Sequence, residues 1–150
     1  MQDNDECEKI KKIQEKMDLI CTYLNENKYP IIKVKAEELI SYFEGDAPSG
    51  DTTTLQQVLK TKWLLIHEIV EISELKKMDF RISFDLLISN PTEVFQAHLV
   101  ATEWEFHLAK KEGANIWIRK RLKNVKSWLN DPEMTSSHIS KCYDLIQKFS

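Results

Sequence analysis

Apolar side chains recur at intervals of three and four residues along most of the chain, and this spacing constrains the fold class most strongly. An α-helix turns once every 3.6 residues, so such a period places the apolar side chains on one face of a helix. Glycine usage agrees, because the 150 residues contain three glycines where average usage would give about ten. Long helices joined by short turns need few glycines. The pattern predicts an all-α protein.

Glycines and prolines divide the chain into the expected helices. We expect helices over residues 4–25, 30–45, 53–78, 90–112, 115–130 and 135–149. Residues 79–89 alternate with a period of two but have no partner strand, so we expect an extended connector with room for a short helical turn at its end. Together these segments predict an up-and-down four-helix bundle with one or two additional short helices, in a single domain over residues 1–150.

Charge and cysteine usage exclude several classes of protein. A net charge of −3 argues against general attraction to nucleic acid or to anionic membranes. No apolar run approaches the roughly 18–20 residues of a membrane span, and the acidic N-terminus does not resemble a signal peptide. Cys7, Cys21 and Cys142 are odd in number and far apart, which fits neither a disulfide framework nor a zinc site. We expect reduced thiols in a soluble, cytoplasmic protein.

Three charged or polar residues fall where apolar ones are expected. On a helical wheel of residues 90–112, His98 and Glu105 lie in the middle of the apolar arc, and Lys62 lies similarly on the wheel of residues 53–78. A buried, unpaired charge costs several kcal/mol, so the simplest arrangement pairs Lys62 with Glu105 beside His98. One interpretation is a satisfied internal ion pair, or a lysine whose amine reaches water. The other is a small internal polar site that binds or acts on a ligand.

The segment His67-Glu68-Ile69-Val70-Glu71 superficially resembles the His-Glu-x-x-His helix of zinc proteases. Glu71 replaces the second histidine, and no third ligand is indicated. On the wheel, His67 and Glu71 lie on the polar side, which favours a solvated helix face. The Glu-x-x-His motif of di-iron bundles is also missing. We therefore predict no metal, no other cofactor and no catalytic residue.

Two further segments bear on anion binding. The helix over residues 115–130 is basic and places Arg119, Lys120, Lys123 and Lys126 on one face. This face is either a solvated surface or a contact for phosphate or nucleic acid, and the net charge makes nucleic acid the weaker choice. The loop 49–54 lacks the lysine and the full glycine spacing of a phosphate loop, so we expect it to cap the next helix.

The runs 62–71 and 103–106, which read KWLLIHEIVE and EWEF, resemble a small uncharacterised archaeal family of all-helical proteins. The resemblance implies a ferritin-like four-helix bundle near the cobalamin adenosyltransferases, able to self-associate and without an assigned activity. The segment Gly50-Asp51-Thr52 is similar to the nucleotide loop of those enzymes.

Our leading hypothesis is a non-catalytic bundle that acts through self-association or a protein partner. The candidate contacts are apolar residues that do not fit a monomer's core, namely Leu19, Leu64, Val100 and Ile116. The alternative is a bundle that binds a small ligand or nucleotide at Lys62, His98 and Glu105.

Overall fold

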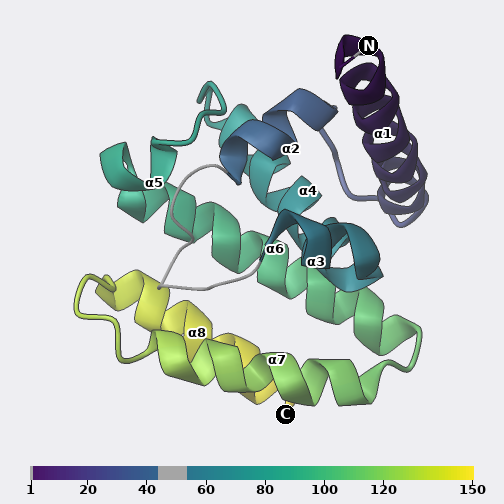
Figure 1. Ribbon diagram of the computed structural model, residues 1–150. Coiled ribbons are helices and arrows are strands. Elements are labelled where there is room, and N and C mark those ends of the chain that lie inside the picture. The colour runs from purple at the N-terminus through teal and green to yellow at the C-terminus, as the bar shows by residue number, and fades with distance from the viewer. Residues whose placement is uncertain (1, 44–53) are drawn as a thin grey trace.

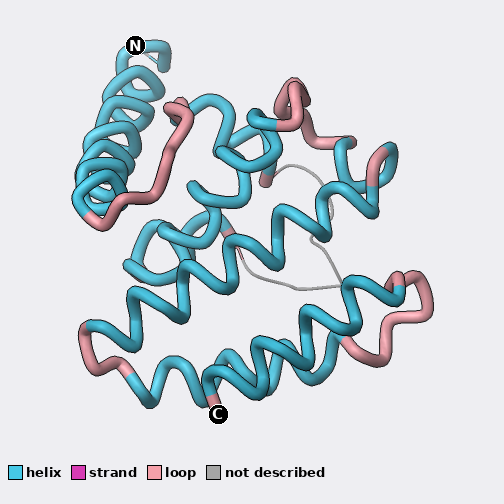
Figure 2. Tube along the Cα trace, turned by 180° about the vertical axis from the view of Figure 1, so that it is seen from behind, coloured by secondary structure: helices cyan, strands magenta, loops and turns pink. Residues whose placement is uncertain are grey.

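The computed structural model describes residues 2–43 and 54–150, and the side chains from residue 5 onward in these ranges. They form eight helices (Figure 1): α1 (Gln2–Glu26), α2 (Ala36–Tyr42), α3 (Leu55–Lys60), α4 (Lys62–Lys77), α5 (Leu86–Ser89), α6 (Pro91–Lys111), α7 (Asn115–Trp128) and α8 (Ser136–Phe149). The described residues contain no strand (Figure 2). The predicted all-α class is confirmed.

Helix α6 lies between two groups of helices. It packs most extensively against α4, which also contacts α1, α2 and α3, and its other neighbours are α5, α7 and α8 (Figure 1). Two apolar clusters result, and α6 contributes to both. One receives Val94, Ala97, Ala101 and Leu108, and the other receives Phe95, Leu99, Phe106 and Ala109. Polar groups along α6 are therefore shielded from water by both clusters.

The helices expected over 4–25, 90–112, 115–130 and 135–149 are present within a few residues of those bounds. Helix α6 begins at Pro91, although the Asn90 side chain makes no capping hydrogen bond, and it ends before Gly113, whose φ is +77°. Helix α8 begins where the Thr135 hydroxyl accepts a hydrogen bond from the His138 amide at 3.2 Å. Proline and glycine therefore mark these helix ends as expected.

The prediction of a helix that begins at Pro30 is wrong for residues 30–35. These residues have no regular structure, and α2 begins only at Ala36. Side chains of other helices satisfy part of this backbone. The Ile32 amide donates to Ser73 at 2.9 Å, and the Ala36 amide donates to Gln14 at 2.7 Å. These long-range contacts outweigh the local preference of proline for a first helical turn.

The prediction of a single helix over residues 53–78 is also wrong, because the structure has two helices there. Thr61 has an extended backbone, with φ −121° and ψ 113°, and separates α3 from α4. The break changes the angular phase of every later residue relative to α3, so a single wheel through both helices does not show which face of α4 continues the apolar face of α3.

The connector between α4 and α6 has the expected form. Residues 80–83 have no regular structure, and α5 is a short helical turn at Leu86–Ser89. Residues 49–53 of the expected capping loop lie outside the described residues. Thr54, which follows them, begins α3 by accepting a hydrogen bond from the Gln57 amide at 3.2 Å.

Two further features of the described chain concern membrane crossing and the cysteines. Within the described ranges, no helix combines the length and apolar character needed to cross a bilayer. Cys7, Cys21 and Cys142 are free, and Cys142 is buried.

Candidate metal centre

A cluster of buried polar side chains lies between α4 and α6. His67 and Glu71 are one turn apart on α4, and His98 and Glu105 are two turns apart on α6. Each of the four exposes 3% or less of its surface. Ionisable side chains are seldom buried this completely without partners. The contacts within the cluster therefore decide what it can do.

Three atoms of the cluster converge on one point. His67 Nε2 lies 3.1 Å from His98 Nδ1 and 3.2 Å from Glu71 Oε1, and His98 Nδ1 lies 2.8 Å from Glu71 Oε1. They form a nearly equilateral triangle of two imidazole nitrogens and one carboxylate oxygen. This triangle is the central feature of the site.

Hydrogen atoms alone cannot satisfy all three contacts. Burial by itself raises the pKa of Glu71, but hydrogen bonds from His67 and His98 lower it well below its ordinary value, so the carboxylate is ionised. If both ring nitrogens donate to it, two N–H groups face each other at 3.1 Å. If either nitrogen keeps its lone pair, that lone pair faces the carboxylate oxygen. A cation held by all three lone pairs removes the conflict.

A second carboxylate fixes the orientation of His67. Glu105 Oε1 lies 2.9 Å from His67 Nδ1, and Arg121 donates to both oxygens of Glu105, at 2.9 and 3.1 Å. Trp117 Nε1 adds a bond to Oε2 at 2.8 Å. A proton held on Nδ1 by Glu105 directs Nε2 of His67 at the triangle, where a bound cation would take the place of the Nε2 proton.

The charges of this second layer are strongly coupled. Burial lowers the pKa of His67, but the hydrogen bonds with Glu105 and Glu71 outweigh it and raise that pKa to about 10. Burial raises the pKa of Glu105, but the Arg121 guanidinium and His67 lower it to about 2. Glu105 is therefore a permanent anion in the core, held between a guanidinium and an imidazolium.

Tyr42, the last residue of α2, orients the ligand carboxylate. Its hydroxyl donates to Glu71 Oε2, the oxygen that does not belong to the triangle. Burial and the negative charge of Glu71 raise the pKa of Tyr42 well above its ordinary value, so the phenol remains a neutral donor. Glu71 thus presents one fixed oxygen, Oε1, to the two histidines.

Aromatic rings surround His98 on its other sides. The ring centroid of Trp128 lies 4.4 Å from that of His98, and the Phe95 centroid lies 5.5 Å away. His98 Nε2 is buried and has no hydrogen-bond partner among the described residues. The orientation of His98 is therefore set by its Nδ1 contacts and by ring packing.

The geometry suits a divalent metal ion. A metal about 2.1 Å from two ligand atoms, at an angle of about 90–110°, holds those atoms about 3.0–3.4 Å apart. The three observed edges, 2.8, 3.1 and 3.2 Å, fall within a few tenths of an ångström of that range. Two histidines and one carboxylate on one face of the ion are also a known ligand set for transition metals.

The pairing predicted between Lys62 and Glu105 is wrong. Lys62 Nζ lies 2.7 Å from Glu112 Oε2 at the surface, with 42% of the lysine side chain exposed. The cation that pairs with Glu105 is Arg121, from α7. His98 and Glu105 are buried as expected, and His67 lies between them and contacts both.

The solvated face predicted for His67 and Glu71 is also wrong, because both are buried. Helix α4 is enclosed on nearly all sides, so it has no polar face for most of its length. Its buried residues include Leu65, Ile66, Ile69, Val70, Ile72 and Leu75. The signal that identifies the site is an acid and a base one turn apart within a run of apolar residues that covers more than one face of the helix.

The basic face predicted on α7 is exposed. Arg119, Lys120, Lys123 and Lys126 all lie at the surface, whereas Arg121 on the same helix is buried against Glu105. The face contributes no residue to the buried cluster.

Comparison with protein-family models, curated proteins and solved structures gives no match. The fold and the site alone therefore describe the molecule. It is an all-α protein with a buried cluster of two histidines and a glutamate, and Glu105, Arg121 and Trp117 form a second layer behind this cluster.

Proposed function

We propose that this protein binds a divalent transition-metal ion in its core, with His67 Nε2, Glu71 Oε1 and His98 Nδ1 as ligands. The observation that carries the proposal is the triangle these atoms form, with edges of 2.8–3.2 Å inside a fully buried cluster. It replaces our sequence-based prediction of no metal, which was based on a wheel that placed His67 and Glu71 in solvent.

The donor set limits which metals fit. Imidazole suits zinc, iron, nickel and copper, while a carboxylate favours harder ions. No thiolate takes part, since none of the free cysteines belongs to the cluster. Zinc(II) and iron(II), with cobalt(II) as a spectroscopic substitute, are the ions that match two imidazoles and one carboxylate.

The surrounding layer supports the same proposal. Histidines that bind metals usually donate their second ring N–H to a carboxylate, which fixes the tautomer and makes the ligand more basic. Glu105 stands in this position toward His67, and Arg121 with Trp117 holds Glu105 in place. A buried ion pair that contributes only to stability would not need two histidines. Here both His67 and His98 contact Glu71.

Cobalt titration tests the proposal. The purified chain is freed of metal with a chelator, and Co²⁺ is added while the visible d–d absorption is recorded. We expect saturation at a single equivalent. Glu71→Gln and His98→Ala weaken Co²⁺ binding by more than about 100-fold, because each removes a ligand.

His107→Ala is the matched control, because His107 is an exposed histidine on the same helix as His98. It should leave the titration unchanged, and circular dichroism should show that every variant remains helical. The proposal fails if the wild-type chain takes up Co²⁺ no more tightly than the Glu71→Gln variant. The cluster would then be a hydrogen-bonded network without a metal.

Self-association remains a second proposal for this chain. Leu19 and Ile116 expose 72% and 78% of their surface, whereas Leu64 and Val100 pack against the core. Exposed apolar side chains favour contact with another copy or with a protein partner. Light scattering tests this, and a monomeric mass at high concentration would contradict it.

The bundle architecture and the ferritin-like resemblance also remain proposals. A metal held by side chains on facing helices, as proposed for α4 and α6, is how helix bundles build such sites. A crystal structure would test whether four helices surround the site in an up-and-down order.

A further inference from the structure

The proposed metal has fewer protein ligands than it needs. Zinc that serves a structural role takes four protein donors, whereas reactive sites keep a position open for an exogenous ligand. His98 Nε2 has no partner within the described ranges, but it cannot bind the metal that Nδ1 of the same ring holds, and the other polar atoms beside the triangle already have partners. Both oxygens of Glu105 accept hydrogen bonds, and the Tyr42 hydroxyl donates to Glu71. The inference below depends on the proposed metal site.

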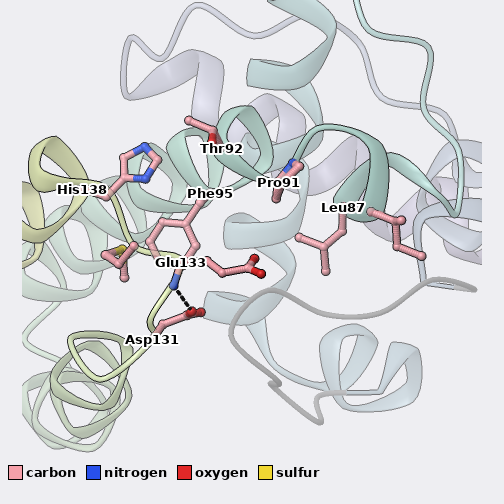
Figure 3. A pocket seen from close by; sticks show the side chains of 9 residues that line it. Leu87, Pro91, Thr92, Phe95, Asp131, Glu133 and His138 are labelled. Carbon is pink, nitrogen blue, oxygen red and sulfur yellow. Dashed lines mark hydrogen bonds between the residues drawn. The ribbon is translucent and has the colours of Figure 1, made fainter.

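A cavity of about 720 Å³ lies close to this centre, between α5, the start of α6 and the turn that leads to α8. Its walls include Leu87, Phe95 and Met134, and Asp131, Glu133 and His138 add polar groups (Figure 3). Pockets of about 300–1,000 Å³ are typical sites for small molecules, and the walls of this one combine apolar and polar side chains.

Phe95 lies between this cavity and the candidate metal ligands. Its ring lines the cavity beside His138 (Figure 3), with 5.3 Å between the ring centroids. It also contacts His98, with 5.5 Å between the ring centroids. His98 follows Phe95 by three residues on α6, so their side chains lie on neighbouring parts of one helix face. A rotation of the Phe95 side chain would therefore connect the cavity with the ligand histidine.

The charges around the cavity select the kind of molecule that enters. Asp131 and Glu133 are the charged residues among those that line it, and no lysine or arginine is among the described lining residues. Burial lowers the pKa of His138, so its ring is neutral at neutral pH. Anions are disfavoured at such a mouth, and walls that combine apolar and polar groups suit a neutral molecule.

We propose that a small, neutral molecule reaches the open coordination position of the metal through this cavity, and that the Phe95 ring is the barrier it must pass. The bond formed is a dative bond from the entering molecule to the metal, with no change in oxidation state.

Stopped-flow mixing of the cobalt-loaded protein with imidazole, at a pH where imidazole is neutral, tests the route. Coordination of imidazole changes the d–d spectrum, so its association rate can be measured directly. Phe95→Leu should raise that rate by at least about tenfold, because a smaller side chain removes the barrier. The affinity of the same variant for Co²⁺ is measured alongside, because Phe95 also packs against the ligand His98.

Phe106→Leu is the matched control, since Phe106 is a fully buried phenylalanine on the same helix that packs against Phe149. It should leave the imidazole rate unchanged. Thr92→Trp provides a second, independent variant. Thr92 is exposed and lines the cavity, so a tryptophan there should fill the mouth and slow association without altering the core.

The possible outcomes separate the two proposals. Equal imidazole rates in the wild type, Phe95→Leu and Thr92→Trp would overturn the route while leaving the metal site intact. A cobalt spectrum that does not respond to saturating imidazole would overturn the open position. Failure of the wild-type chain to bind Co²⁺ would overturn both proposals.

Discussion

Glu105 is a buried anion whose neighbours compensate its charge from three directions. Arg121 and Trp117 reach it from α7, and His67 reaches it from α4. Because Glu105 has no access to water, the loss of its main cation would leave an uncompensated charge in the core.

Replacement of Arg121 by methionine tests this role. The volume is nearly kept, but Glu105 loses its permanent cation, and we expect the free energy of unfolding to fall by about 3–5 kcal/mol. Urea denaturation of the metal-free protein measures the change. Lys120→Met, at the exposed neighbouring position, should change stability by less than about 0.5 kcal/mol. An equal effect of the two variants would contradict the central role of the Arg121–Glu105 pair.

Tyr42→Phe tests the support of the ligand carboxylate. The ring remains, but the hydroxyl that orients Glu71 is lost, so we expect metal affinity to fall by about 10–100-fold with little loss of helix content. Cobalt titration provides the affinity. Tyr143→Phe, which alters an exposed tyrosine on α8, should have no effect. Unchanged affinity in Tyr42→Phe would show that Glu71 does not need this hydrogen bond.

Residue patterns could predict part of this site. His98 and Glu105 stand out because the residues around them on α6 are apolar, so a wheel of that one helix places both in the protein interior. Tyr42 and Arg121 give no such signal, because they come from other helices and meet the cluster only through tertiary packing. A basic residue on a basic helix, such as Arg121, is expected at the surface unless its buried partner, here Glu105, is known.

The helices themselves show where sequence patterns succeed. Pro91 and Gly113 bound α6 through local backbone preferences, so both ends were predictable. Thr61 carries no comparable signal, and its extended backbone separates α3 from α4. A wheel predicts Lys62 inside and His67 outside, the reverse of what the structure shows, because α4 is buried all round along its middle and Lys62 is its first residue, at the surface.

Gly113 permits a quantitative test at the end of α6. Its φ of +77° is strained for a side chain, and a Cβ atom there would meet no other atom within 4 Å. Gly113→Ala should therefore cost about 1 kcal/mol from backbone strain alone. Gly113→Asn should cost less, because asparagine tolerates the left-handed region. Thermal unfolding can rank the two variants, and an alanine variant as stable as the wild type would contradict the assigned conformation.

At the scale of the molecule, the cluster links the two halves of the core. Helix α6 contributes to both apolar clusters, and the candidate ligands join it to α4 across its most extensive interface. A metal bound by both helices would bind the folded state and not the unfolded chain, so binding should stabilise the whole fold.

Stability measured with and without metal tests this coupling. At a free metal concentration of 100 times Kd, we expect a gain of about 2.7 kcal/mol in the free energy of unfolding. The His107→Ala variant should show the same gain, and His98→Ala should show none. A gain in His98→Ala equal to that of the wild type would place the stabilising ion elsewhere.

Anomalous X-ray scattering from a crystal grown with zinc measures the central claim most directly. The account predicts a single strong peak at the zinc edge between α4 and α6, about 2.0–2.2 Å from His67 Nε2, Glu71 Oε1 and His98 Nδ1. A map with no peak at that point, and with the three side chains still in mutual contact, would contradict it.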